Sequence, residues 1–110
     1  MKPETITKTV CDYLGVTVNI MKCKSRTRVV VYNKKWVIFF LHMYSDLTLK
    51  EIAIEASLTN HQTIIYHCRE LRDHMERNQE ARFHYNNLID LFTANDAYTH
   101  DLSETVYAPI

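Results

Sequence analysis

The stretch at residues 47–71, LTLKEIAIEASLTNHQTIIYHCREL, constrains the fold more than any other part of the chain. Apolar residues recur in it at helical spacing on both sides of a polar run at residues 59–63. This pattern predicts two short amphipathic helices joined by a tight bend. Thr48 followed by Glu51 is typical of a capping box, which places the start of the first helix.

Helical patterns also account for most of the remaining chain. Pro3 and Gly15 are typical of the two ends of a helix, because proline is tolerated in a first turn and glycine best adopts a left-handed cap. The apolar run that follows Asn33 is too long for a strand, although the β-branched residues before it would fit one. We expect a mostly buried helix over residues 33–45, a short helix or a turn over 16–24, and further helices over 60–78 and 80–92.

These patterns predict an all-α fold of about five to six helices that contains a helix-turn-helix. We expect one domain over residues 1–93 and an irregular acidic tail over residues 94–110. In the second helix of the motif, Ile64 and Ile65 are expected to begin a buried stripe. The other residues expected to be buried are Trp36, Phe39, Phe40, Cys68, Leu71 and Met75, with Phe83, Leu88, Ile89, Leu91 and Phe92 in the last helix.

The formal net charge of zero conceals an asymmetry along the chain. Residues 1–40 contain eight Lys/Arg and two acidic residues, a balance of +6, whereas residues 41–110 contain five and eleven, a balance of −6. The basic run is a solvated loop by default, but it is dense enough to give one face a positive field that a polyanion would feel.

Composition and motif spacing exclude several classes of site. A single glycine rules out a P-loop or a dinucleotide fingerprint, so no nucleotide binding is expected. Neither Cys-x-x-Cys nor His-Glu-x-x-His spacing occurs, and no paired carboxylates stand on an apolar background, so we expect no metal, no cofactor and no enzyme activity. Three cysteines without paired spacing and no long apolar segment indicate a cytoplasmic protein without a membrane span.

The polar run at residues 59–63 suggests what the motif does. In a helix-turn-helix, the first turn of the second helix contacts base edges in the major groove of DNA. Asn, Gln, His and Thr can form hydrogen bonds with base edges and phosphates, and none of them carries negative charge. Either Thr59 or Asn60 is expected to cap the helix, and Asn60 is favoured. A helix cap accounts for only one of these polar residues, so it does not explain the presence of His61, Gln62 and Thr63.

At these positions the chain resembles the carboxy-terminal DNA-binding domain of the bacterial replication initiator DnaA, a Trp-repressor-like helical fold. The resemblance covers about residues 5–92. The family signature, Gly-Gly-Arg-Asp-His-Thr-Thr-Val followed by a Cys-Arg pair, aligns without a gap with SLTNHQTI at residues 57–64 and with Cys68 and Arg69. The run KSRTRVVVYNKKW at residues 24–36 is in register with the basic loop of the family. Both signature glycines are replaced here, so packing of Leu58 is expected to stabilise the turn.

The resemblance implies contacts with double-stranded DNA from the basic loop. Arg26 and Arg28 would approach the minor groove or its flanking phosphates, where a narrow A/T-rich groove attracts arginine. Lys34 and Lys35 would hold the DNA backbone at the start of the buried helix.

The turn supplies the second set of expected DNA contacts. His61, Gln62 and Thr63 would face the major groove, where glutamine can pair with adenine and a threonine methyl can contact thymine. The complete set of expected DNA-binding residues is Arg26, Arg28, Lys34, Lys35, Thr59, Asn60, His61, Gln62 and Thr63.

The expected function is therefore sequence-specific binding of double-stranded DNA, by a small repressor or an accessory replication factor of a phage or mobile element. The resemblance covers the DNA-reading part of the initiator and not its ATPase module. The alternative is a protein-interaction module on the same fold, in which the acidic carboxy-terminal half binds a partner protein and the polar turn has lost its DNA contacts.

Overall fold

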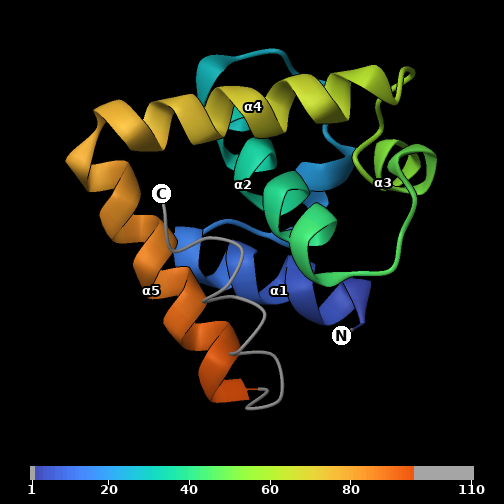
Figure 1. Cartoon of the computed structure of the whole chain (residues 1–110). Helices are drawn as coiled ribbons and strands as arrows, with labels where there is room; N and C mark the ends of the chain where they lie inside the picture. Colours follow the sequence, from blue (N-terminus) through green and yellow to red (C-terminus); the bar gives the residue numbers. More distant parts are fainter. Residues whose placement is uncertain (1, 96–110) are drawn as a thin grey trace. The chain divides into compact units, whose positions relative to one another are not determined.

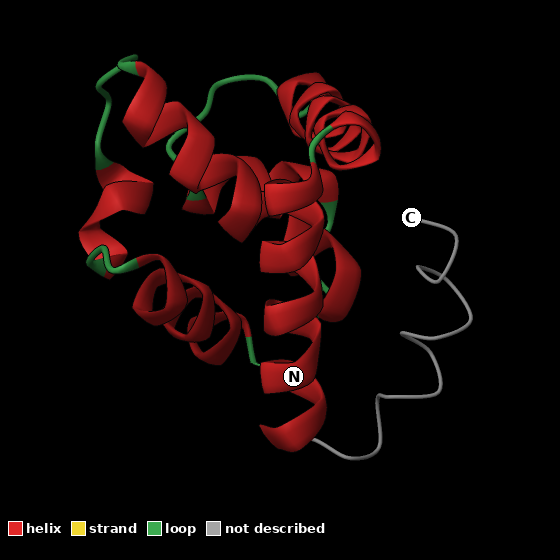
Figure 2. Ribbon diagram, turned by 90° about the vertical axis from the view of Figure 1, so that its left-hand side faces the viewer, coloured by secondary structure: helices red, strands yellow, loops and turns green. Residues whose placement is uncertain are grey.

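The computed structural model describes residues 2–95, and these residues form helices and loops without any strand (Figure 2). The prediction of an all-α fold with about five to six helices is confirmed (Figure 1). No helix in this range is long and apolar enough to span a membrane. The elements are α1 (Pro3–Leu14), the 3₁₀ helix η1 (Val18–Lys22), α2 (Arg28–Tyr44), α3 (Leu49–Glu55), α4 (Gln62–Arg77) and α5 (Gln79–Asn95).

The chain divides into two compact units between Leu71 and Arg72, a point that lies within α4. The first unit contains the complete helix-turn-helix sequence, and the second contains the remainder of α4 and α5. The single domain expected over residues 1–93 remains a prediction. Residues 94 and 95 of the expected irregular tail belong to α5, and residues 96–110 lie outside the described part.

Helix α1 begins and ends as its sequence predicts. Pro3 occupies the first turn, and Gly15 adopts the left-handed conformation with φ of 76°. The Gly15 N–H donates to the Asp12 carbonyl oxygen at 3.3 Å, which satisfies one of the carbonyls that a helix end leaves without a partner. A residue with a Cβ would be strained at this φ, so the single glycine of the chain has a local structural role.

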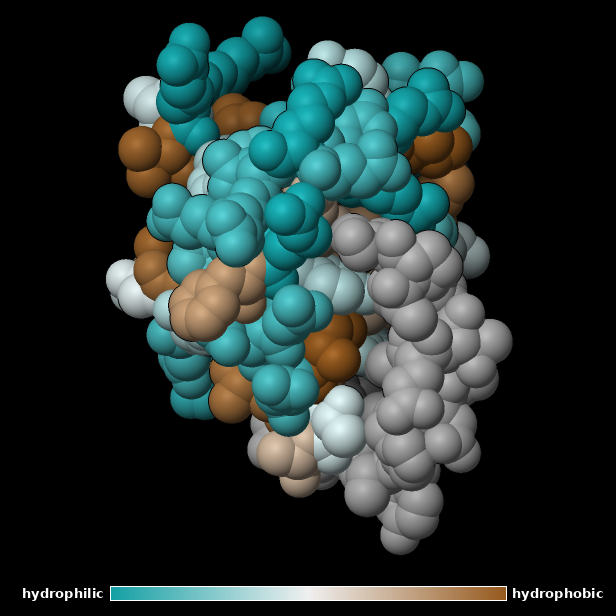
Figure 3. Space-filling view, turned by 60° about the vertical axis from the view of Figure 1, so that its left-hand side comes forward, coloured by the Kyte–Doolittle hydropathy of each residue, from teal (hydrophilic) through white to brown (hydrophobic). Residues whose placement is uncertain are grey.

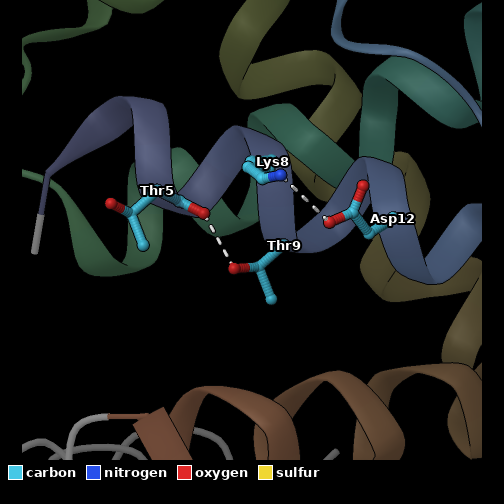
Figure 4. Close-up of polar contacts among 4 residues, drawn as sticks. All are labelled: Thr5, Lys8, Thr9 and Asp12. Carbon is cyan, nitrogen blue, oxygen red and sulfur yellow. Dashed lines mark hydrogen bonds and ion pairs between the residues drawn. The ribbon is translucent and has the colours of Figure 1, made fainter.

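The polar contacts drawn in Figure 4 lie within α1 itself. Lys8 and Asp12 form an exposed ion pair at 3.8 Å, and the Thr9 hydroxyl donates to the Thr5 carbonyl oxygen at 2.8 Å. Exposed ion pairs contribute little to stability, so the inner face must hold this helix in place. The buried residues of that face are Ile6, Val10 and Cys11.

Helix α2 is the central element of the first unit and packs against α1, η1 and α3. Six consecutive residues, 36–41, are buried, which leaves no solvent face over that length. Trp36 stacks on Phe40 with 6.4 Å between ring centroids, and Phe40 stacks on Tyr44 at 6.0 Å. The prediction that Trp36, Phe39 and Phe40 belong to the core is confirmed.

The predicted start of this helix, near Asn33, is wrong. Helix α2 begins at Arg28, and the Val31 N–H already donates to the Thr27 carbonyl oxygen at 3.0 Å. The three valines at residues 29–31 favour a strand by propensity, but no strand is present among residues 2–95 for them to pair with. A helix satisfies their backbone groups within the segment itself. The segment over residues 16–24, for which a helix or a turn was open, contains η1.

Helix α3 starts with the predicted capping box. The Glu51 N–H donates to the Thr48 hydroxyl at 3.2 Å, and the Thr48 N–H donates to the Glu51 carboxylate at 2.9 Å. These two bonds satisfy backbone donors that the first turn of a helix cannot pair internally.

Helix α3 ends in a Schellman motif that contains no glycine. Ser57 is left-handed with φ of 58°, the Ser57 N–H donates to the Ile54 carbonyl, and the Leu58 N–H donates to the Ala53 carbonyl at 2.8 Å. These are the two hydrogen bonds that define the motif. Ser57 therefore occupies a conformation that usually selects glycine.

In the second unit, Asn78 separates α4 from α5. The Asn78 side chain accepts a hydrogen bond from the Ala81 N–H at 2.9 Å, and the Arg82 guanidinium donates to the carbonyls of Met75 and Glu76 at the end of α4. Both contacts satisfy backbone groups that helix ends leave unpaired.

The apolar face predicted for the last helix is partly wrong. Phe83 is 61% exposed and Leu91 is 40% exposed, whereas Leu88 and Phe92 are fully buried. The buried positions repeat at intervals of four, three and four residues, which is one stripe of a helix. This stripe consists of Ala81, Tyr85, Leu88 and Phe92.

The strained turn gives a first prediction. Replacing Ser57 with Gly should raise the free energy of unfolding by roughly 0.5–1 kcal/mol, because glycine adopts the left-handed conformation without the steric cost of a Cβ. This gain outweighs the additional chain entropy that glycine loses on folding. Urea denaturation followed by circular dichroism measures the difference. Ser57→Ala keeps the Cβ and is the matched control, with no gain expected. An equal gain in both variants would show that the backbone conformation is not the cause.

Candidate nucleic-acid interface

The polar run at residues 59–63 forms the turn between α3 and the start of α4. The Asn60 side-chain oxygen accepts a hydrogen bond from the Gln62 N–H at 2.8 Å, so Asn60 caps α4 as expected. Thr59, His61 and Gln62 are exposed, and Thr63 is half-buried. The turn therefore presents several uncharged hydrogen-bonding groups within one short segment.

The outer face of α4 continues from this turn. Gln62, Ile65, Tyr66 and Arg69 follow at helical spacings of three, four and seven residues, which places them on one side of the helix, and all four are exposed. The expectation that Ile65 begins the buried stripe is wrong, since it is 43% exposed while the neighbouring Ile64 is fully buried. Tyr66 is 56% exposed.

Three residues of this face, Ile65, Tyr66 and Arg69, were not among the expected contacts. Their spacing from Gln62 was a usable signal in the sequence, but two apolar residues in an amphipathic helix are assigned to the core by default. The four side chains extend over about 10 Å along the axis of a helix whose diameter, about 10–12 Å, fits a major groove about 12 Å wide. They combine an amide, an aliphatic group, a phenol and a guanidinium.

The basic segment before α2 is exposed throughout. Lys22, Lys24, Arg26 and Arg28 are all exposed, and none of them forms an ion pair with the residues that the structure describes. No acidic residue occurs anywhere in residues 13–45, so the positive charge is not neutralised along the chain.

Arg26 lies in the middle of a small hydrogen-bonded turn. The Ser25 hydroxyl accepts from the Thr27 N–H at 3.3 Å and donates to the Thr27 hydroxyl at 3.3 Å. Serine and threonine favour such local turns because their side chains can bond nearby backbone groups. Immediately afterwards, Arg28 is fixed as the first residue of α2.

Lys34 and Lys35 do not lie at the start of a helix, and that expectation is wrong. Both are well inside α2, which begins at Arg28. Lys34 is 7% exposed, and its Nζ donates to the Ala56 carbonyl oxygen at 3.0 Å. Lys35 Nζ pairs with the Glu70 carboxylate of α4 at 2.8 Å. The structure thus places Arg26 and Arg28 at the surface and engages the two lysines in intramolecular contacts.

The Lys35–Glu70 pair has His67 beside it. His67 Nδ1 is buried without a hydrogen-bond partner in the described structure and lies 3.9 Å from Glu70 Oε1. The hydrogen bond from Lys35 lowers the pKa of Glu70 below its ordinary value. Burial, and then the charge of Lys35, lowers the pKa of His67 below 6.5. His67 is therefore held neutral next to an ion pair.

The histidines and cysteines elsewhere in residues 2–95 do not assemble into a site. No group of three His, Cys, Asp or Glu residues that could hold a metal occurs among residues 2–95. Cys68 was expected to be buried and is only half-buried. Burial raises the pKa of the Cys11 thiol to about 11, which keeps it protonated and unreactive.

The environment of His67 gives a second prediction. The folded state binds the His67 proton less tightly than the unfolded chain, so the free energy of unfolding should fall as the pH decreases from 6.5 through the lower folded pKa. Protonation of Glu70 in the folded state reduces stability only below pH 4.5, because its folded pKa is lowered, so this effect does not overlap the pH window of His67. Thermal unfolding measured between about pH 7.5 and about pH 5.5 should show a smaller loss of stability in His67→Gln than in the parent.

The control for this measurement is His42→Gln. His42 is an exposed histidine of α2, so its replacement removes an imidazole without disturbing the Lys35–Glu70 pair. We expect it to retain the pH dependence of the parent. An identical pH dependence in His67→Gln and the parent would contradict the assignment.

The similarity to known proteins covers the segments that form this candidate interface. The family model described as the bacterial DnaA protein helix-turn-helix matches residues 3–71. Proteins named chromosomal replication initiator protein DnaA are similar to this chain: one from Thermodesulfovibrio yellowstonii is 28% identical over 76 residues, and one from Treponema pallidum is 31% identical over 68 residues. The matches cover 69% and 62% of this chain but only 17% and 15% of those relatives.

The matched residues include α1, η1, α2, α3 and the start of α4, which carry both the basic segment and the polar turn. The match therefore covers well over half of the chain and contains the entire candidate interface of the first unit. The chain belongs to the family of the bacterial DnaA helix-turn-helix.

Proposed function

We propose that this protein binds double-stranded DNA through its helix-turn-helix and the basic segment before α2. The outer face of α4 enters the major groove, and Arg26 and Arg28 contact the adjacent minor groove or its phosphates. The observation that carries this proposal is the exposed face of α4, where Gln62 and Arg69 can form hydrogen bonds with base edges and Ile65 can contact a thymine methyl group. The first turn of such a helix is where this motif approaches bases.

The arrangement of α2 supports simultaneous DNA contacts by the basic segment before α2 and by the helix-turn-helix. Arg28 and Lys35 are seven residues apart on α2, which places them on one side of the helix, about 10 Å apart along its axis. Lys35 is bonded to Glu70 on α4 at 2.8 Å. The side of α2 that carries Arg28 therefore also contacts α4. Arg28 and the outer face of α4 can then contact the same ligand.

The biological role is proposed from the likeness to the initiators. A DNA-binding protein of this kind would act as a small repressor or as an accessory replication factor, in the cytoplasm where bacterial DNA is found. A binding role fits a site that consists of hydrogen-bonding and basic side chains. We infer that the chain is not an enzyme.

A protein-interaction module is the competing interpretation. On the face drawn in Figure 3, hydrophobic surface occurs as separated patches among hydrophilic residues. Proteins that bind other proteins commonly expose contiguous apolar patches. The described residues drawn in that view therefore do not form one large apolar patch.

Selection from a pool of random duplexes, followed by fluorescence anisotropy at several salt concentrations, tests the proposal. We expect enrichment of a shared sequence and an affinity that falls steeply with salt, because phosphate contacts release counterions. Absence of binding to any duplex at low ionic strength would favour the protein-interaction module instead.

A third prediction concerns the basic segment. The double variant Arg26→Ala with Arg28→Ala should weaken binding to all duplexes and reduce the slope of log affinity against log salt by about 0.9 for each lost phosphate contact. The double variant Lys2→Ala with Lys8→Ala removes the same charge from exposed sites at α1 and should keep the slope. An unchanged slope in the arginine variant would remove this segment from the interface.

A fourth prediction concerns the turn. Gln62→Ala should cost ~1–3 kcal/mol of affinity for the selected duplex and leave binding to unrelated DNA nearly unchanged, as a lost base contact does. Its effect on the free energy of unfolding should stay within about 0.5 kcal/mol, because Gln62 is exposed. Gln79→Ala is the matched control, since Gln79 is also an exposed glutamine at the first position of a helix. Equal losses on both duplexes would make Gln62 a phosphate contact.

A further inference from the structure

The ammonium group of Lys34 lies at the carboxyl end of α3, far from it in sequence. Its Nζ donates to the Ala56 carbonyl oxygen at 3.0 Å across a separation of 22 residues. Ala56 is the C-cap residue of α3. Directly after it come the left-handed Ser57 and then Leu58, whose N–H donates back to Ala53.

The chemistry of this contact favours a cation. The last carbonyls of a helix have no partner within it, and they form the negative end of the helix dipole. An ammonium group at that point satisfies the carbonyl and interacts favourably with the dipole. A buried charge without a partner would be costly, so the bond to Ala56 is what makes this position acceptable for lysine.

The contact also adds a constraint from α2 to a segment whose other described hydrogen bonds are local. The turn between α3 and α4 lacks glycine, and its conformation depends on backbone hydrogen bonds and on the Asn60 cap. Lys34 projects from α2, which is the most buried helix of the first unit. Its bond therefore ties the exit of α3 to a rigid reference within the same unit.

We propose that Lys34 is a positioning residue for DNA recognition, whose buried ammonium sets the path of the turn from α3 into α4 and hence the presentation of Gln62 to the major groove. This inference rests on the proposed function. It assigns to Lys34 a role that differs from the phosphate contact implied by the family resemblance, because a side chain that is 7% exposed and bonded to Ala56 is not available to a phosphate.

A positioning role makes a distinctive combination of predictions for Lys34→Met. This variant keeps most of the aliphatic stem and removes the charge and the donor. The ratio of affinity for the selected duplex to affinity for unrelated DNA should fall at least about tenfold, because base contacts depend on geometry more than phosphate contacts do. The salt slope should stay unchanged, because no phosphate contact is lost.

Three comparisons make the experiment decisive. Lys8→Met carries the same change at an exposed position of α1 and should keep the affinity ratio. Lys34→Arg retains a cationic donor and should recover most of the ratio. Hydrogen exchange of the Leu58 amide, measured by NMR, should accelerate more than about tenfold in Lys34→Met relative to the Ile38 amide of α2, since the turn loosens locally.

The outcomes separate the alternatives. A salt slope reduced by about 0.9 would show that Lys34 contacts a phosphate and would overturn the proposal. An unchanged affinity ratio in a folded Lys34→Met would also overturn it. If Lys34→Met does not fold, Lys34→Gln, which keeps a neutral donor, is measured in the same way and the same criteria apply. Failure of the parent protein to bind any duplex would instead reject the proposed function itself.

Discussion

The hydrogen bond from the Lys34 ammonium to the Ala56 carbonyl connects the core helix of the first unit to the motif that carries the candidate interface. Burial of residues 36–41 gives α2 a fixed position, and Lys34 extends that position to the carboxyl end of α3. Lys35, the next residue, pairs with Glu70 on α4. Adjacent lysines of one helix thus contact both helices of the motif, the carboxyl end of α3 through Ala56 and α4 through Glu70.

The basic residues of the chain consequently have two different uses. Lys34 and Lys35 are engaged inside the first unit, while Lys22, Lys24, Arg26 and Arg28 are exposed in a region without acidic residues. Burial lowers the pKa of Lys34, which is the cost of placing a charge inside. The segment before α2 and the start of that helix therefore form an exposed basic region with no acidic residue nearby in the sequence. Counting basic residues along the sequence overestimates the charge that a ligand would meet.

The features that could be predicted from the sequence are those that depend on neighbours within one turn. The capping box of Thr48 and Glu51, the left-handed Gly15 and the Asn60 cap are all present, because each requires only backbone groups two to four residues away. The predictions that failed concern which side of a helix is covered. Ile65 is apolar and exposed, as Phe83 is in the second unit, and their hydropathy does not reveal what packs beside them.

By itself, the sequence determined that the chain is helical, where α1 begins and ends, where α3 begins, and which polar residues lie at the turn before α4. Local hydrogen bonding and helical periodicity are encoded within a few residues, so no distant contact is needed to infer them. Only the tertiary structure decided that Lys34 is a buried cap, that Lys35 pairs with Glu70 and that Ile65 and Tyr66 extend the exposed face. The two lysine contacts join groups 22 or more residues apart, so no local pattern contains them. Whether a charge is buried or an apolar group is exposed follows from packing, and hydropathy alone does not decide it.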